Sequence, residues 1–318
     1  MAIPKHGAYA LLIAAHMFLG RLGIAVAADI RPEIYGASSL KTIAIEGTIV
    51  PGDFDTFLRI VRENQGHISG VYCFSPGGNL YEAMKIGRAM RALELSSQAP
   101  MRDETGRPLC SLGLSKPHDP KNCTCGSAGF FVHIAATHRG GTFLAVHRPY
   151  FEKGGLSQLS PPDAHRALDG LQQSVREYMT EMGVPAHIQY EVLNTAPDTV
   201  RILNEATIKT NFWGDLIYIR EWMQDKCRML SDSERERDVS YYRRLANADL
   251  SETGLSKAEQ TDLHGLDKKW DQQLKCEVSI RAQRRADAYA KYFGERPNES
   301  VPLKRGGSPQ VYSPTPTK

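Results

Sequence analysis

Apolar and polar residues in the first third of the chain alternate in a way that predicts strands followed by helices. Residues 42–46 (TIAIE) and 68–75 (ISGVYCFS) are short, β-prone and mostly apolar, as buried strands are. Asp53 is placed to cap a helix that runs to about residue 64, and Asn79 opens a second helix with apolar residues at helical spacing. This alternation predicts an α/β layered domain.

The same pattern continues to about residue 220. Residues 126–136 (GSAGFFVHIAA) predict an apolar helix, residues 141–146 (GTFLAV) a strand, and residues 163–182 a long amphipathic helix with a shorter one at 186–193. Residues 101–122 are polar and contain three prolines, which is typical of a surface insertion. We therefore expect one α/β domain over residues 40–220.

The chain changes character after this domain. Residues 231–293 are dense in Arg, Lys, Glu and Gln with sparse apolar positions, so residues 221–294 are expected to form a helical extension whose helices pack against the main domain. Residues 295–318 are rich in Pro, Ser, Gly and Thr, a composition that predicts a disordered tail.

The N-terminal segment has the pattern of a secretory signal peptide. A basic start precedes the apolar residues 8–20, and residues 25–28 (AVAA) offer small-residue cleavage sites, of which we favour the one after Ala28. His16 and Arg21 interrupt the apolar run, which is then shorter than the roughly 20 residues of a membrane span, so a membrane anchor is disfavoured. Residues 1–28 are therefore expected to direct the chain to the periplasm or the exterior.

An exported chain with six cysteines is expected to contain disulfides. We predict that Cys110 pairs with Cys123 or Cys125, and that Cys227 pairs with Cys276. A zinc site is the rival interpretation, which the spacing supports poorly. No metal or organic cofactor is implied, and a net charge of +3 gives no indication of a nucleic-acid partner.

Ser127 is the candidate nucleophile. It lies between small residues in the segment CGSAG, at the start of an apolar helix whose free N–H groups would face the site. A helix cap is the ordinary alternative for a serine in this position. Gly77 and Gly78 follow a strand and could turn their N–H groups toward a ligand, as an oxyanion hole requires, or they could form a simple tight turn.

His147 is the candidate base, because it ends the strand at 141–146 and could reach Ser127 from a different element. A partly buried histidine at a strand end is the alternative interpretation. His133 and His138 fall on the helix expected after Ser127, and a helical rise of about 1.5 Å per residue would put His138 ~16 Å away.

Four segments, taken in order, resemble the Clp protease proteolytic subunit and its secreted relatives. They are Gly47 with Pro51-Gly52-Asp53, then Phe74-Ser75-Pro76-Gly77-Gly78-Asn79, then Gly126-Ser127-Ala128-Gly129, and then Val146-His147-Arg148-Pro149. The resemblance covers residues 40–217. It implies a fold of the Clp protease and crotonase type, in which repeated β-β-α units form superhelical layers, and which commonly assembles into homo-oligomers.

The resemblance also implies roles for particular residues. Ser127 would be the nucleophile and His147 the general base, while the N–H groups of Gly78 and Ala128 would form the oxyanion hole. The third triad residue aligns without gaps on Val200, and Asp198 is the nearest carboxylate, which we therefore choose. A shift of two residues in a strand keeps the face but moves the side chain by roughly 7 Å.

These features predict an exported serine peptidase that acts on a peptide or protein. The first alternative is a catalytically inactive member of the fold that binds or assembles in the periplasm. A crotonase-type acyl-CoA enzyme is disfavoured because export separates the chain from coenzyme A. A Cys-His hydrolase that uses Cys123 or Cys125 requires a free thiolate.

Overall fold

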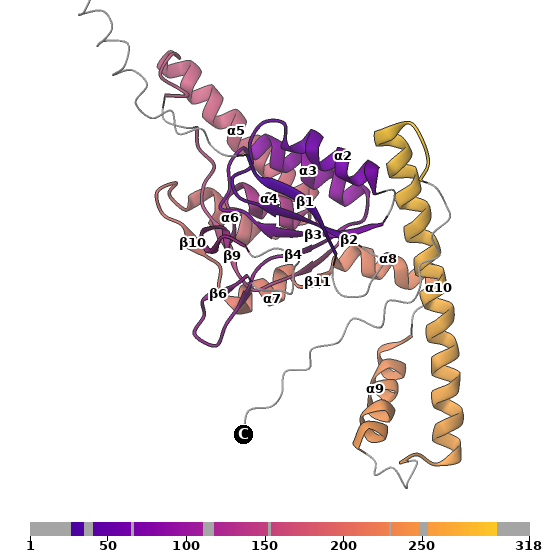
Figure 1. Ribbon diagram of the computed structural model, residues 1–318. Coiled ribbons are helices and arrows are strands. Elements are labelled where there is room, and N and C mark those ends of the chain that lie inside the picture. The colour runs from indigo at the N-terminus through magenta and orange to yellow at the C-terminus, as the bar shows by residue number, and fades with distance from the viewer. Residues whose placement is uncertain are drawn as a thin grey trace, which may run out of the picture.

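The computed structural model describes residues 27–34, 41–64, 67–110, 118–151, 154–228, 230–247 and 254–297. It shows a mixed α/β domain and a C-terminal helical region (Figure 1). The strands are β1 (Asp29–Ile34), β2 (Lys41–Glu46), β3 (Ile68–Phe74), β4 (Ser96–Gln98), β5 (Met101–Arg102), β6 (Pro108–Leu109), β7 (Cys125–Gly126), β8 (His138–Gly140), β9 (Leu144–Val146), β10 (Arg201–Ile202) and β11 (Gly214–Asp215). The helices are α2 (Asp53–Glu63), α3 (Leu80–Ala92), α4 (Ala128–Ile134), α5 (Pro161–Glu181), α6 (Ala186–Asn194), α7 (Glu205–Phe212), α8 (Ile217–Cys227), α9 (Asp232–Asn247) and α10 (Lys257–Phe293).

A six-stranded sheet in the order β1-β2-β3-β4-β8-β11 forms the centre of the domain. Its inner strands β2, β3, β4 and β8 are parallel, and β1 and β11 are antiparallel edges. The inner strands read as apolar runs because helices pack on the sheet, and Ile43, Ile45 and Val71 are at most 2% exposed.

Helices α2, α3 and α4 lie together over the sheet (Figure 1). The predicted cap of α3 is present, since the side chain of Asn79 accepts a hydrogen bond from the N–H of Glu82 at 3.0 Å. The long helix α5 reaches this layer through Tyr178, whose buried hydroxyl donates to the carbonyl of Phe131 at 2.8 Å.

A second, smaller sheet in the order β10-β9-β7 adjoins the first. An isolated parallel bridge joins Ser75, just after β3, to Cys125 on β7. The end of the central strand β3 therefore lies beside the strand that leads into Ser127.

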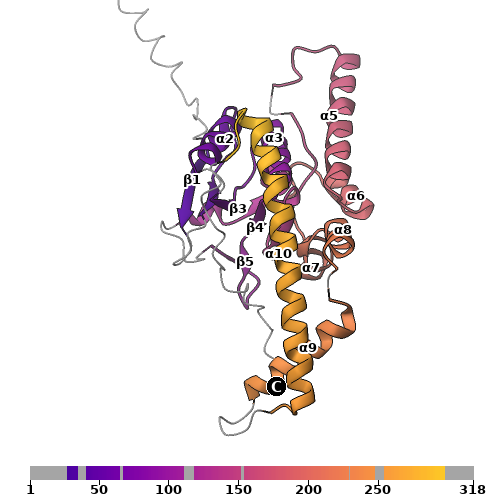
Figure 2. The same ribbon diagram turned by 90° about the vertical axis from the view of Figure 1, so that its right-hand side faces the viewer.

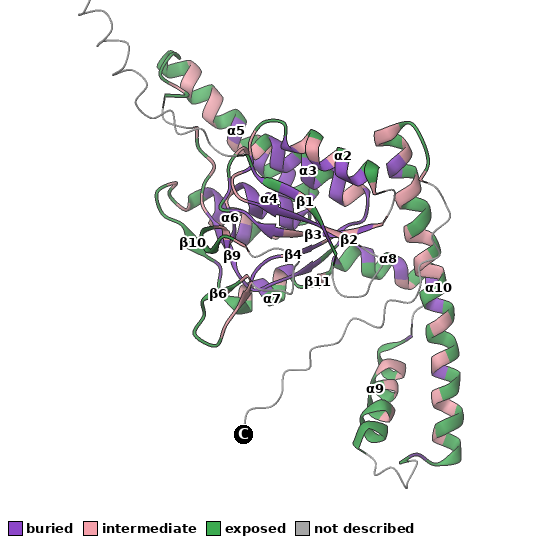
Figure 3. Ribbon diagram, in the orientation of Figure 1, coloured by how far each residue is buried: buried purple, intermediate pink, exposed green. Residues whose placement is uncertain are grey.

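The C-terminal region departs in part from the prediction. The second half of α10 packs against the domain, where Tyr289 donates its hydroxyl to the carbonyl of Arg62 and Arg285 donates to the carbonyl of Leu93. Helix α9 has no buried residue, and its tyrosines donate to carboxylates on α10 instead. The hairpin of α9 and α10 projects away from the sheet and is mostly exposed (Figures 2 and 3).

Several local predictions need correction. The helix after Ser127 ends at Ile134, so His138 lies on strand β8 and not on that helix. The insertion at 101–122 contains the β5-β6 hairpin. Most of the predicted signal peptide and the predicted tail from residue 298 lie outside the described residues, apart from Ala27 and Ala28 at the leader's end.

All six cysteines form disulfides. The predicted pairs Cys110–Cys123 and Cys227–Cys276 are confirmed, and a third, Cys73–Cys125, joins β3 to β7. These bonds leave no thiolate for a zinc site or a Cys-His hydrolase. Within the described residues, no helix combines the length and apolar character needed to cross a bilayer.

Gly87 on α3 should be essential for docking α5. A Cβ at this position would lie 1.9 Å from the Tyr178 hydroxyl and 2.9 Å from the Cβ of Ala135. We expect Gly87→Ala to lower the free energy of unfolding by about 1–3 kcal/mol, measured by denaturant titration. The control Gly170→Ala, on open α5 surface, should raise it by about 0.5–1 kcal/mol, and equal effects would contradict the packing explanation.

Candidate active site

Ser127 occupies a strained turn between strand β7 and helix α4. Its backbone has φ 51° and ψ −119°, a conformation that residues with a side chain rarely adopt. Its N–H donates to the carbonyl of Ala145 at 3.0 Å, which ties the turn to β9. The Ser127 hydroxyl makes no capping hydrogen bond to α4, so the alternative of a simple helix cap is wrong.

Gly77 and Gly78 form the opposite wall of this turn. Both have positive φ values, 127° and 126°. A Cβ on Gly77 would lie 2.5 Å from the Cβ of Ser127, and a Cβ on Gly78 would lie 2.2 Å from the carbonyl oxygen of Ile49. Only glycine fits at these two positions, because Gly77 lies against Ser127 and Gly78 lies against the backbone of Ile49.

Two backbone N–H groups lie at the pocket that the Ser127 side chain lines. Gly78 and Ala128 both line the same pocket as Ser127. Among the described residues, neither the N–H of Gly78 nor that of Ala128 has a hydrogen-bond acceptor, whereas neighbouring N–H groups do. Two unpaired N–H groups next to a serine are the arrangement that stabilises the oxyanion of an acyl-transfer intermediate.

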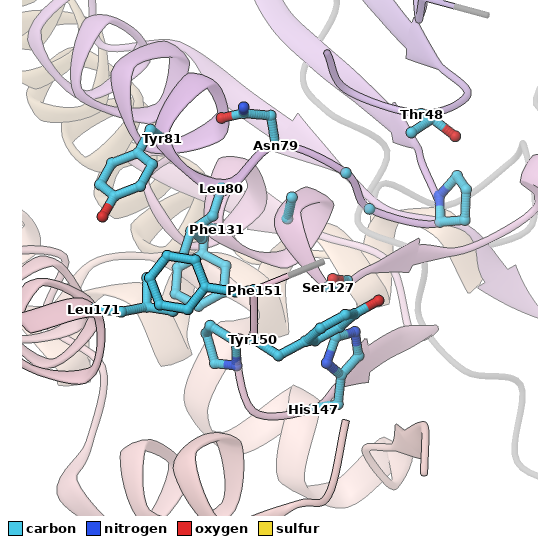
Figure 4. Close-up of a pocket in the computed structure, with 15 residues that line it drawn as sticks. Thr48, Asn79, Leu80, Tyr81, Ser127, Phe131, His147, Tyr150, Phe151 and Leu171 are labelled. Carbon is cyan, nitrogen blue, oxygen red and sulfur yellow. The ribbon is translucent and has the colours of Figure 1, made fainter. Parts of the chain in front are cut away.

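His147 reaches the pocket from the end of β9. The close-up shows Ser127 and His147 lining the same pocket from different elements (Figure 4). The Nδ1 of His147 lies 3.0 Å from the carbonyl oxygen of Arg148. Because a carbonyl oxygen only accepts, Nδ1 carries the proton and Nε2 is left with a lone pair, as a general base needs.

The described contacts include no hydrogen bond between the Ser127 hydroxyl and the His147 ring. Catalytic hydrogen bonds are often long in a site without substrate and shorten when substrate binds. The ring of Tyr150 lies beside His147, with their centroids 5.7 Å apart, and forms part of the same pocket wall.

Among the described residues, no hydrogen bond or ion pair joins the Asp198 carboxylate to the His147 ring. Asp198 is exposed, and its carboxylate accepts a hydrogen bond from the hydroxyl of Thr199 at 3.4 Å. Strands β9 and β10 pair Val146 with Arg201, so continuing that register by one residue places Val200 opposite His147. The side chain of Val200 is apolar and 61% exposed, so it cannot accept the His147 N–H as a triad carboxylate would.

The other two histidines considered from the sequence do not face this pocket. His133 is fully buried in α4, where burial lowers its pKa to about 3, and its Nδ1 lies 3.0 Å from the Ser97 hydroxyl. His138 lies on β8 and pairs with Asp215 at 3.2 Å. In the described residues, no group of three or more His, Cys, Asp or Glu side chains is arranged to hold a metal.

The pocket has a volume of about 470 Å³ and one strongly apolar wall. Residues from four elements or loops form this wall, and the sequence motifs did not indicate them. They are Leu80, Phe131, Tyr150, Phe151 and Leu171. Phe131 and Leu171 were predicted only as helix residues, because a contact between α4 and α5 has no local signature in the sequence.

The Cys73–Cys125 disulfide covalently joins the two halves of the site. Cys73 precedes the glycine turn on β3, and Cys125 precedes Ser127 on β7. Both cysteines are at most 1% exposed. The bond therefore holds the strand before the Gly77-Gly78 turn beside the strand before Ser127, from within the core.

Replacing both of these cysteines by alanine should lower the free energy of unfolding by about 2–5 kcal/mol and slow the reaction of Ser127 with a fluorophosphonate. The control is the Cys227→Ala, Cys276→Ala variant, which opens a loop of similar sequence separation, 49 against 52 residues. It should cost comparable stability and leave the fluorophosphonate rate unchanged. Equal rates in both variants would show that the Cys73–Cys125 bond does not organise the site.

Comparison with known proteins adds little to this geometry. No protein-family model matches the chain, and no curated protein matches it. Among solved structures, a mutant of the 1510-N membrane-bound stomatin-specific protease is similar at 15% identity, over 58% of this chain and 83% of that chain, with a TM-score of 0.34. The function proposed below therefore depends on the residues and contacts of the site itself.

Proposed function

We propose that the protein is a serine hydrolase that cleaves peptide bonds, with Ser127 as nucleophile and His147 as general base. The observation that carries this proposal is the strained backbone of Ser127. Its hydroxyl does not cap α4, and it lines the same pocket as the N–H groups of Gly78 and Ala128, which have no acceptor among the described residues. Strain of this kind persists only where the surrounding structure imposes it, and here the glycine turn and the β7–β3 disulfide do so.

The reaction follows from the positions of these groups. His147 Nε2 removes the Ser127 proton as the oxygen attacks the substrate carbonyl carbon, and the oxyanion accepts hydrogen bonds from the N–H groups of Gly78 and Ala128. The imidazolium then protonates the leaving amine. Water, deprotonated by His147, hydrolyses the acyl-enzyme and restores Ser127.

The apolar wall favours a substrate with a large apolar side chain next to the cleaved bond. Leu80, Phe131 and Leu171 would bury such a side chain, and each buried CH₂ contributes about 0.8 kcal/mol. A peptide or protein is the substrate class we propose.

The wider setting is part of the same proposal. The four ordered motifs support a Clp-protease-like domain. Because that fold commonly assembles into homo-oligomers, we propose that this protein does so as well. Three disulfides fit an oxidising compartment, which supports export to the periplasm or the exterior.

Fluorophosphonate labelling tests the nucleophile. The full chain should be labelled at Ser127, and Ser127→Ala should abolish labelling. His147→Ala should slow it by at least about 100-fold, the usual contribution of a general base. Labelling that persists in Ser127→Ala, or no labelling of the folded protein at all, would favour the inactive binding or assembly protein.

A second test concerns the missing carboxylate. We propose that the carbonyl of Arg148 orients His147 in its place, so Asp198→Asn should leave kcat unchanged. Val200→Asp should raise kcat by at least about tenfold, a small part of the roughly 10⁴-fold contribution of a triad carboxylate. It should also move the acidic limb of the pH–rate profile to higher pH, because a carboxylate stabilises the imidazolium.

Val200→Asn is the matched control and should not move the pH profile. A large loss of kcat in Asp198→Asn would instead identify Asp198 as the third triad residue.

A further inference from the structure

Asp53, the first residue of α2, is a buried carboxylate that lacks a cation. It is 4% exposed and accepts a hydrogen bond from the N–H of Val50 at 2.8 Å, and the nearby N–H of Ala28 acts to lower its pKa. Among the described residues it forms no ion pair. Burial raises its pKa, and the carboxylate of Glu82 raises it further. An ionised carboxylate in such a place is costly unless a positive charge joins it.

The charges nearest to Asp53 do not supply that cation. Glu82 carries the same sign, and its own carboxylate is already bound by Lys85 and by the N–H groups of Gly52 and Phe54. The position beside Asp53 that could hold a cation is the nitrogen of Ala28, which already points at the carboxylate.

Ala27 and Ala28 are packed into the domain. Ala28 is 8% exposed and belongs to the hydrophobic core, and Ala27 forms a parallel bridge with Thr48. The Cα of Ala28 would lie 3.8 Å from a Cβ placed on Gly47. Ala28 is thus part of the folded protein, so a cleavage after Ala28 would remove a buried residue together with its N–H beside Asp53.

The sequence offers a cleavage site one residue earlier. Ala25-Val26-Ala27 has the A-x-A pattern of a signal-peptide cleavage site and ends directly before Ala28. Hydrolysis there breaks the bond between the carbonyl carbon of Ala27 and the nitrogen of Ala28. The hydroxyl of water goes to Ala27, and the Ala28 nitrogen gains one proton from that water and one from solvent to become an ammonium.

We propose that the leader is removed between Ala27 and Ala28, and that the new α-ammonium of Ala28 forms a buried ion pair with Asp53. The nitrogen that has a single N–H in the uncleaved chain then carries a full charge and three donors. Cleavage of the leader therefore supplies the positive charge that the buried Asp53 carboxylate lacks at the start of α2.

This ion pair would also brace the candidate active site. Asp53 holds the N–H of Val50, and the adjoining Ile49 donates to the carbonyl of Gly77 at 2.8 Å and accepts from the N–H of Asn79 at 2.7 Å. Thr48, which pairs with Ala27, lines the pocket. The processed N-terminus is thereby connected to the glycine turn through one short segment, residues 48–50.

The first test is the N-terminus of the exported protein. The full chain, expressed with its own leader in a bacterial host, should yield a product whose intact mass and N-terminal sequence begin at Ala28. A product that begins at Asp29, or at any other residue, would overturn the proposal.

The second test asks whether the ammonium and Asp53 act together. A leader with its cleavage site moved by one residue yields a mature chain that retains Ala27, in which the Ala28 nitrogen is a neutral amide. We expect this chain to unfold at a temperature at least about 5 °C lower than the chain that begins at Ala28, because one partner of a buried ion pair has been removed.

Asp53→Asn provides the matched background, since the amide keeps an acceptor for the Val50 N–H without the charge. In that background, retaining Ala27 should have no further effect. An equal loss in both backgrounds, or no loss in either, would show that no ion pair forms. These measurements need no catalytic activity, so they are independent of the hydrolase proposal.

Discussion

The close approach of two backbones, at Gly77-Gly78 and at Ser127, is the constraint on which the rest of the site depends. It leaves no room for a Cβ on Gly77, while the backbone of Ile49 leaves none on Gly78, and Ser127 has a positive φ that its own side chain disfavours. The isolated parallel bridge between Ser75 and Cys125 brings the end of β3 beside β7, and the Cys73–Cys125 bond joins the same two strands covalently. The same close contact therefore involves the Cys73–Cys125 disulfide, the Gly77-Gly78 pair and the strained backbone of Ser127.

The pattern of apolar residues predicted strands β2 and β3 and helices α2, α3 and α5 well, because their signals are local. The predicted strands at 42–46 and 68–75 and the helix opened by Asn79 are present nearly as expected. Strands β4, β8 and β11 were missed, since each has only two or three residues, and such elements are defined by their partners and not by their own sequence. The edge strand β1 was also missed, because it was assigned to the segment directly after the leader. The same reason explains why the helix after Ser127 was extended too far, to include His138.

The candidate site shows the same difference between features with a local sequence signal and features that depend on strand pairing. Ser127 and the glycine pair carry local signals, and the structure brings them together. The surroundings of His147 could not be predicted, because the register of β9 and β10 decides which side chain stands opposite it, and that register places Val200 there. Asp198 was chosen for its charge, and sequence distance alone does not tell whether a loop carboxylate turns toward the ring.

The Cys227–Cys276 bond has a consequence for how this molecule would respond to damage. It joins α8 to α10 at the base of the projecting hairpin, so everything between the two cysteines forms one closed loop of chain. A single nick in that exposed loop would leave the two fragments covalently connected, and the half of α10 that packs on the domain would stay in place. The attachment of that half of α10 to the domain therefore does not depend on an unbroken chain through the hairpin.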